Sequence, residues 1–120
     1  MKKTLIIGAS TNPTRYSFLA ANRLVKHGHE IVQIGRATGQ VAGEAILTGK
    51  PELPHDIDTV TLYISPQHQA EWYDYVLTLQ PKRVIFNPGT ENPDFENLLE
   101  SHHIEALEAC TLVLLSIGNY

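Results

Sequence analysis

The stretch TLIIGASTNPTRYS, residues 4–17, decides the fold that we predict for this chain. It opens with an apolar run of strand length at residues 4–8, passes through a turn of small and polar residues, and enters a segment with helical spacing over residues 16–27. Gly28 follows that segment as a C-cap. The apolar residues expected on the buried face of this helix are Phe18, Ala21, Leu24 and Val25. A strand, a short turn and an amphipathic helix form the first unit of a parallel α/β sheet.

The same alternation of strand and helix continues along the chain. The strands predicted after the first one cover residues 30–35, 59–64, 83–87 and 104–108. Further helices are predicted to begin at Pro66 and, after a capping Asn92, at Pro93, because proline is favoured in the first helical turn. These patterns predict one α/β domain over residues 1–120. Its expected architecture is a Rossmann-like, doubly wound parallel sheet of about five strands with helices on both faces.

Two segments depart from this alternation. Residues 36–58 contain several glycines and prolines, so we predict a loop there, with a short extended piece near residues 45–47. Residues 110–117 are apolar almost all round. We therefore expect them to be buried against the sheet or against the second subunit of a homodimer.

Composition excludes several classes of protein. The formal net charge is -4 and no run of lysine or arginine occurs, which argues against a nucleic-acid partner. No apolar run approaches the roughly 20 residues that a membrane span needs, so no membrane partner is expected. The single cysteine, Cys110, cannot form an intramolecular disulfide, and a cytoplasmic location is the default expectation.

The residues that follow the predicted strands are the first place to search for a ligand site. Ligands of open parallel sheets bind outside the carboxyl ends of the strands, where the strand order reverses. The turn after the first strand, residues 8–11, is Gly8-Ala9-Ser10-Thr11, and its small residues allow backbone N–H groups to approach a phosphate at a helix N-terminus. Ser17 adds a hydroxyl and Arg15 a charge. The alternative is an ordinary strand-to-helix turn without a ligand.

The turn after the second strand indicates which nucleotide would bind. NAD-binding sheets usually carry an acidic residue there for the ribose hydroxyls, whereas this chain has Gly35-Arg36. An arginine suits a phosphorylated ribose, which occurs in NADP at the 2′ position and in coenzyme A at the 3′ position. The residues leave both ligands open, and a solvated loop charge is the alternative role for Arg36.

Neither a metal site nor catalytic machinery is predicted. The six histidines include no pair at i, i+4 beside a glutamate, so no metal ligands are assigned. No serine lies in a G-x-S-x-G turn, and the strand-end loops offer no nucleophile with a neighbouring base. We assign no catalytic residue.

Several short motifs, taken together in order and spacing, resemble the CoA-binding domain family. The motifs are Ile7-Gly8-Ala9-Ser10, Arg15-Tyr16-Ser17, Gly28-His29-Glu30-Ile31-Val32, Gly43-Glu44, Tyr63-Ile64-Ser65-Pro66, Asn87-Pro88-Gly89-Thr90-Glu91-Asn92 and Glu108-Ala109-Cys110. This family comprises stand-alone relatives of the nucleotide-binding part of the succinyl-CoA synthetase α subunit. The resemblance covers nearly the whole chain. Members often carry Asn-Pro or Ser-Pro after the second strand, where this chain has Gly35-Arg36.

The resemblance implies a Rossmann-like fold that binds coenzyme A or an acyl-CoA, a small-molecule nucleotide ligand, without a known reaction. The site residues implied are Gly8, Ala9, Ser10, Thr11, Arg15, Tyr16, Ser17, Gly35, Arg36, Ile64, Ser65, Pro66, Asn87, Pro88 and Gly89. Two other functions remain as alternatives. One is a small NADP-dependent or nucleotide-processing enzyme, and the other is a domain without a ligand that acts as a protein-interaction partner.

Overall fold

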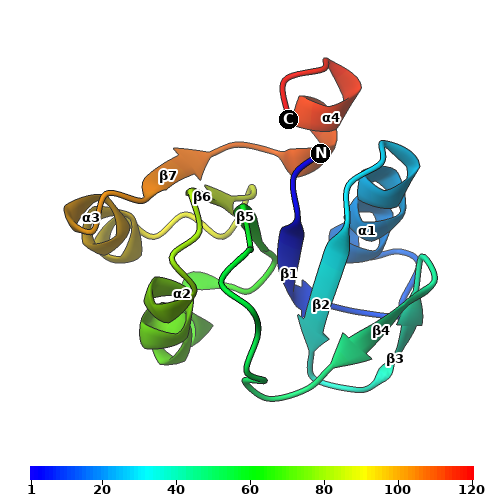
Figure 1. The fold of residues 1–120 in the computed structure, drawn as a ribbon, viewed down its shortest axis with the longest axis horizontal. Helices are drawn as coiled ribbons and strands as arrows, with labels where there is room; N and C mark the ends of the chain where they lie inside the picture. Colours follow the sequence, from blue (N-terminus) through cyan, green and yellow to red (C-terminus); the bar gives the residue numbers. More distant parts are fainter.

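The structure of this protein is a computed structural model that describes residues 1–120. In chain order its elements are β1 (Thr4–Ala9), α1 (Tyr16–Lys26), β2 (Ile31–Gly35), β3 (Gly39–Val41), β4 (Glu44–Leu47), β5 (Thr59–Leu62), the 3₁₀ turns η1 (Pro66–His68) and η2 (Ala70–Trp72), α2 (Tyr73–Leu79), β6 (Arg83–Phe86), α3 (Pro93–Ser101), β7 (Glu105–Glu108) and α4 (Thr111–Ser116). Figure 1 shows how they are arranged around one sheet. None of the helices has the length and apolar character needed to cross a membrane.

The sheet has seven strands in the order β3-β4-β2-β1-β5-β6-β7. All neighbouring strands are parallel except β3 and β4, which form an antiparallel hairpin. The α/β class is confirmed, and the arrangement is consistent with the Rossmann-like prediction. The predicted number of about five strands is wrong, because β3 and β4 occupy the segment predicted as a loop around a short extended piece.

The missed hairpin is held by local geometry and by one buried side chain. Its two turn residues, Ala42 and Gly43, both have positive φ, 56° and 81°, as two-residue hairpin turns of type I′ require. The side chain of Gln33 on β2 donates from Nε2 to the main-chain oxygens of Val41 and Glu44, each at 3.1 Å. An Ala-Gly turn is not a strong hairpin signal, and the tertiary contact from Gln33 is invisible in the sequence.

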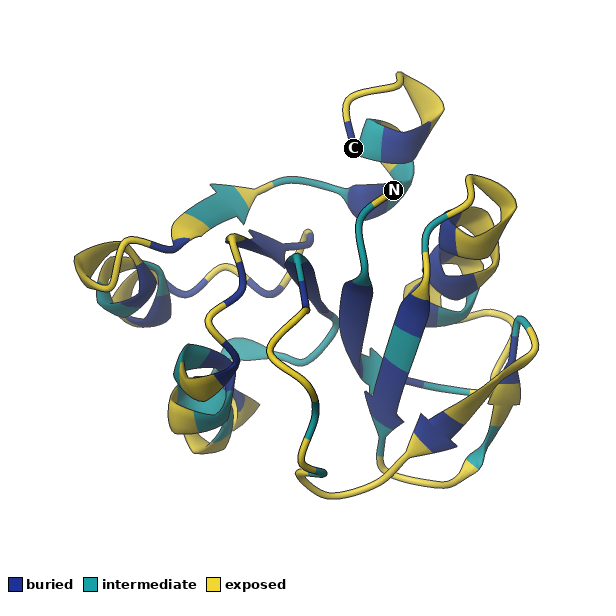
Figure 2. Cartoon of the chain, viewed as in Figure 1, coloured by how far each residue is buried: buried dark blue, intermediate teal, exposed yellow.

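Two apolar layers flank the sheet. One unites residues of β1, β5 and β6 with Val76 and Leu79 of α2 and with Phe95 and Leu99 of α3. The other unites the opposite face of the sheet with α1 and α4. Figure 2 shows the central strands buried and the outer surfaces of the helices exposed. Helices therefore cover both faces, as expected.

Helix boundaries agree with the sequence patterns except in one helix. The Asn92 side chain caps α3 by accepting from the Phe95 N–H at 3.2 Å. The helix expected to begin at Pro66 instead starts as the two 3₁₀ turns, and α2 begins only at Tyr73. On α1, Val25 is 41% exposed, so its expected burial is wrong.

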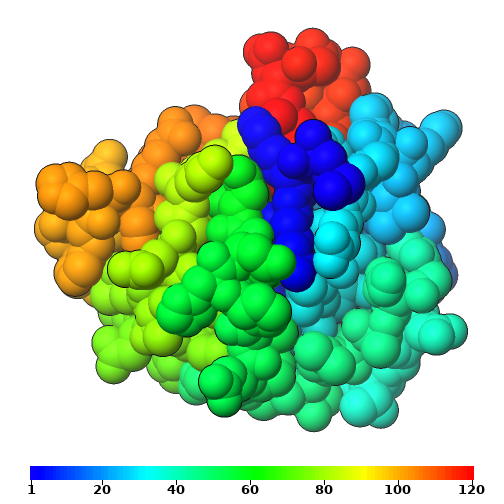
Figure 3. Space-filling view, viewed as in Figure 1, coloured from blue at the N-terminus to red at the C-terminus, as the bar shows by residue number.

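The C-terminal segment is only partly buried. In α4 the side chains of Thr111 and Leu115 face inward, whereas Val113 and Ile117 are 52% and 61% exposed. Burial against the sheet therefore holds for the inner face of α4 alone, and burial of its outer face against a second subunit stays a prediction. After α4 the chain turns back to the end of the sheet at which β1 begins, and both chain ends lie there (Figures 1 and 3).

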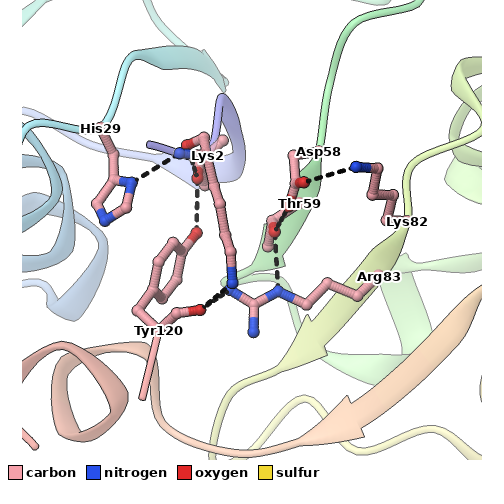
Figure 4. Close-up of polar contacts among 8 residues, drawn as sticks. Lys2, His29, Asp58, Thr59, Lys82, Arg83 and Tyr120 are labelled. Atoms are coloured by element: carbon pink, nitrogen blue, oxygen red, sulfur yellow. Dashed lines mark hydrogen bonds and ion pairs between the residues drawn. The ribbon is translucent and has the colours of Figure 1, made fainter. Parts of the chain in front are cut away.

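Tyr120 anchors this segment at the amino ends of the strands (Figure 4). Its hydroxyl and that of Thr4 share a hydrogen bond of 2.6 Å, and its ring lies 4.8 Å from the ring of His29. Arg83 donates from Nη2 to the main-chain oxygen of Tyr120 at 2.8 Å, and Lys2 donates to the same oxygen. Burial raises the pKa of the Tyr120 hydroxyl. These contacts hold the two ends of the chain together at the amino ends of the strands.

Candidate functional site

A cleft of about 810 Å³ lies at the carboxyl ends of the central strands. It is lined by residues that follow β1, β2, β5 and β6. Since β2 lies on one side of β1 and β5 on the other, this is the point at which the strand order reverses. Such switch points are where open α/β sheets bind their ligands.

The cleft gathers nearly all of the residues predicted from the sequence. Lining it are Gly8, Ala9, Ser10, Thr11, Arg15, Tyr16, Ser17, Gly35, Arg36, Ile64, Ser65, Pro88 and Gly89. Pro66 and Asn87 are not among the lining residues. Residues from four strand-end loops thus meet at one cleft, although the first and last of them, Gly8 and Gly89, are 81 positions apart in the sequence.

Two glycines allow the strand ends at this cleft to approach one another. Gly8 has φ +100°, and a Cβ there would lie 2.6 Å from the main-chain oxygen of Tyr63. A Cβ on Gly35 would lie 2.3 Å from the main-chain oxygen of Ala9. Both contacts are with backbone, which cannot move aside cheaply. Substitution of either glycine would therefore disturb the sheet as well as the cleft.

The N-terminus of α1 opens onto the cleft without an internal cap. Arg15 occupies the N-cap position with no side-chain hydrogen bond to the helix, and the first turn has no acidic residue. The Ser17 side chain is buried at 3% exposure, lines the cleft, and makes no hydrogen bond within the protein. Unpaired N–H groups and the positive end of the helix dipole favour an anion at such a position.

Two arginines add formal positive charge to this end of the cleft. Arg15 and Arg36 are exposed, line the cleft, and form no ion pair within the protein. A guanidinium can donate two parallel hydrogen bonds to a phosphate. The β1 and β2 side of the cleft can therefore bind more than one anionic group.

The cleft is also lined by residues that were not predicted from the sequence, on the β1 and β2 side as well as on the opposite side. They are Ile7, Ile34, Ala37, Tyr63, His68, Glu71, Trp72 and Thr90. His68, Glu71 and Trp72 come from the two 3₁₀ turns, where a regular helix was expected. Burial raises the pKa of the Tyr63 hydroxyl to about 12, so it stays protonated at neutral pH. Glu71 and Trp72 lie seven and eight positions beyond the predicted strand end at residue 64, so the residues directly after that strand do not include them.

The loop after β6 is shaped by a β-turn. The Thr90 N–H donates to the Asn87 main-chain oxygen at 2.9 Å, with Pro88 and Gly89 between them. Gly89 has φ +92°, and proline followed by a positive-φ glycine is typical of a type II turn. A Cβ on Gly89 would meet nothing within 4 Å, because this residue faces the open cleft.

The side chain of Asn87 has internal partners for its polar atoms. It donates from Nδ2 to Thr61 Oγ1 at 2.6 Å and to the Leu62 main-chain oxygen at 2.9 Å. Its Oδ1 accepts from the Thr111 N–H at 2.9 Å. Asn87 is only 3% exposed and joins β6 to β5 and to the start of α4. The structure thus places this predicted ligand residue in the packing beneath the cleft.

Gln69 joins the two loops that form the far wall of the cleft. It is fully buried and donates from Nε2 to the main-chain oxygens of Ile64 and Thr90 at 3.0 and 2.8 Å. Its Oε1 accepts from Asn92 Nδ2 at 3.0 Å. The loop after β5 and the loop after β6 are therefore held in a fixed relation. No sequence pattern distinguished this glutamine from its exposed neighbour Gln67.

Comparison with known proteins agrees with this geometry. The family model described as the CoA binding domain matches residues 2–116. The chain belongs to the CoA-binding domain family. The family predicted from the short motifs is thereby confirmed, and the cleft is the candidate ligand site of a CoA-binding domain. No protein with a curated description matches the chain significantly.

Solved structures show that this fold recurs in other proteins. A crystal structure of an uncharacterized protein is 52% identical, with a TM-score of 0.96 over 100% of this chain and 98% of the other. A Thermus thermophilus protein is 22% identical, with a TM-score of 0.88 over 99% of this chain and 90% of its own. A hypothetical protein of Pyrococcus horikoshii is 21% identical, with a TM-score of 0.84 over 93% and 80% of the two chains. The last two similarities concern the fold alone.

Proposed function

We propose that this chain binds coenzyme A or an acyl-CoA in the cleft and has no catalytic machinery of its own. The observation that carries the proposal is the uncapped N-terminus of α1, which opens onto the cleft beside the unpaired Ser17 hydroxyl. Membership of the CoA-binding domain family supports this ligand over other phosphorylated compounds. The cleft volume, about 810 Å³, lies within the range of roughly 300–1,000 Å³ common to small-molecule sites.

The ligand's parts are assigned to the cleft by their chemistry. The pyrophosphate accepts hydrogen bonds from the backbone of residues 8–11, from the start of α1 and from Ser17. Arg36 binds the 3′-phosphate of the ribose through its guanidinium. The pantetheine chain, which is neutral and partly apolar, extends past Ile64 and Trp72.

Calorimetry with two ligands tests this assignment. The wild-type protein should bind CoA more tightly than 3′-dephospho-CoA by about tenfold to hundredfold, since a hydrogen bond to a charged group contributes about 1.5–3 kcal/mol. Arg36→Ala should lose most of that preference and should bind the dephosphorylated ligand almost unchanged. Arg23→Ala is the matched control, because Arg23 is an exposed arginine of α1 that does not line the cleft. Equal wild-type affinities for the two ligands would contradict the role of Arg36.

A second nucleotide is compatible with the same arginine. NADP carries a 2′-phosphate that Arg36 could bind at the end of β2. A preference for NADP over CoA in the same titrations would favour a nucleotide-dependent enzyme. No binding of either ligand would favour the protein-interaction alternative.

A further inference from the structure

The charged residues of the cleft are divided between its two sides. Arg15 and Arg36 lie on the side formed by β1 and β2, whereas Glu71 lies on the side formed by β5 and β6. Glu91 is exposed and does not itself line the cleft, but it lies at its far rim, since its Oε1 accepts from the N–H of the cleft residue Gly89 at 2.9 Å. No lysine or arginine lines the cleft on this far side.

The lysines and arginines of the chain are confined to its first 83 residues, whereas acidic residues occur before and after that point. No lysine or arginine follows Arg83 in the sequence, and the acidic residues beyond it are Glu91, Asp94, Glu96, Glu100, Glu105 and Glu108. One cation lies against the far side from outside the cleft, because the Nζ of Lys50 is 4.9 Å from the centre of the Trp72 ring. Lys50 does not line the cleft. Glu71 is therefore the acidic side chain that lines the far side, and Glu91 lies next to that side in the loop after β6.

This polarity has a consequence for how an anionic ligand lies. Neighbouring strands are about 4.8 Å apart, so the three steps from β2 to β6 span about 14 Å. The phosphates of the ligand favour the positive side, where the start of α1 and both arginines lie. The opposite end of the ligand is then directed toward Glu71, Trp72 and the loop after β6. A second negative charge at that end would meet carboxylates in place of cations.

We propose that the cleft selects CoA thioesters whose acyl group is uncharged and discriminates against acyl groups that end in a carboxylate. Glu71 and Glu91 are the specificity-determining residues, and they act by electrostatic repulsion across the far side. This inference rests on the proposed function, because it assumes that the phosphates of CoA occupy the positive side. The ligand class is thus a monocarboxylic acyl-CoA or free CoA.

Butyryl-CoA and succinyl-CoA provide a matched comparison. Their acyl groups each have four carbons, and they differ in the terminal carboxylate, so the charges of the CoA moiety cancel between them. At pH 8, above the usual histidine pKa, and at low ionic strength, butyryl-CoA should bind the wild-type protein roughly threefold to tenfold more tightly. The preference should shrink as salt is added, since salt screens repulsion between exposed charges.

Variants assign the effect to the two glutamates. Glu71→Gln combined with Glu91→Gln should bind both thioesters with nearly equal affinity, mainly through tighter binding of succinyl-CoA. Glutamine at position 91 keeps an oxygen that can accept from the Gly89 N–H, so the loop should retain its shape. Asp74→Asn is the matched control, because Asp74 is an exposed carboxylate on α2 that does not line the cleft. It should keep the full preference for butyryl-CoA.

The outcomes separate this inference from the proposed function. If CoA and both thioesters bind with equal affinity, the selection by charge is wrong while the CoA site stands. The same conclusion follows if the double variant retains the preference of the wild-type protein. If none of the three ligands binds, the proposed function fails and this inference fails with it.

Discussion

Replacement of Asn87 by alanine should destabilise the fold strongly, although this residue lies next to the loop that lines the candidate cleft. Its side chain is 3% exposed and takes part in three hydrogen bonds, with Thr61, the Leu62 main-chain oxygen and the Thr111 N–H. Alanine can make none of them. The variant therefore removes the link between β6, β5 and the first turn of α4.

The size of the effect follows from these contacts. Each hydrogen bond contributes about 1 kcal/mol to stability, and a buried donor left without a partner costs about 1–3 kcal/mol. The Thr111 N–H is at the start of α4 and has no helical partner, so it bears the second cost. The two bonds that Asn87 donates contribute about 1 kcal/mol each, and the unpaired Thr111 N–H costs about 1–3 kcal/mol. Together they predict a loss of about 3–5 kcal/mol in the free energy of unfolding. That is a large part of the 5–15 kcal/mol typical of a domain.

Urea denaturation followed by circular dichroism measures this loss. Ser65→Ala is the control, because Ser65 lines the cleft and makes no side-chain hydrogen bond, so its stability should change by no more than about 0.5 kcal/mol. A loss below about 1 kcal/mol for Asn87→Ala would refute the structural role. Unchanged stability together with lost CoA binding would show that Asn87 contacts the ligand directly.

Three more perturbations test the packing around the cleft and the chain ends. Gly35→Ala should lower the free energy of unfolding by at least about 2 kcal/mol in denaturant titration, because its Cβ would lie 2.3 Å from the Ala9 oxygen. Burial lowers the pKa of His29 below its ordinary value of 6.5, so the unfolded state binds the proton more readily. Thermal stability should therefore fall as pH drops below about 6.5 and should be independent of this group above that pH. Tyr120→Phe should cost about 1 kcal/mol, since it removes the hydrogen bond to Thr4.

The first two of these outcomes have matched control variants. Gly49 has a positive φ, but a Cβ there would meet open space. Gly49→Ala should therefore lower the free energy of unfolding by less than Gly35→Ala does. His29→Gln should reduce the fall in stability on the acid side, whereas the exposed His55→Gln should leave it in place. An acid-side profile that is the same in His29→Gln and wild type would contradict the assignment to His29. Tyr120→Phe with wild-type stability would show that the bond to Thr4 contributes nothing.

Local signals account for the parts of the fold that could be predicted. Apolar runs of strand length and apolar residues at helical spacing reflect side chains that must face a core. They predicted the helices α1 and α3 and all strands except those of the hairpin, which are β1, β2, β5, β6 and β7. Asn92 was predicted as a cap because asparagine is favoured at that position before a helix, and its side chain accepts from the Phe95 N–H as predicted. The loops after β1 and β2 were found because ligand sites follow strand ends in parallel sheets.

Other features depend on contacts between distant residues. Gln69 and Asn87 make their hydrogen bonds to segments 5 to 26 positions away, and no periodicity marks such partners. The hairpin of β3 and β4 needs the buried Gln33 on β2 to satisfy its backbone. The 3₁₀ turns bring His68, Glu71 and Trp72 to the cleft. The sequence predicted a regular helix from Pro66 instead, and none of these three residues was among the predicted site residues.

The sequence by itself determined the α/β class, the family and the two loops that carry positive charge, because these depend on local periodicity and on short motifs. Only the tertiary structure decided which side of the cleft is negative, which glycines are constrained by backbone contacts, and that Asn87 belongs to the packing. Strand order and side-chain direction bring together residues far apart in the chain. The physical reason is that hydrogen bonds, steric contacts and charge repulsion depend on the distance between residues in space. The separation of two residues along the chain does not reveal that distance.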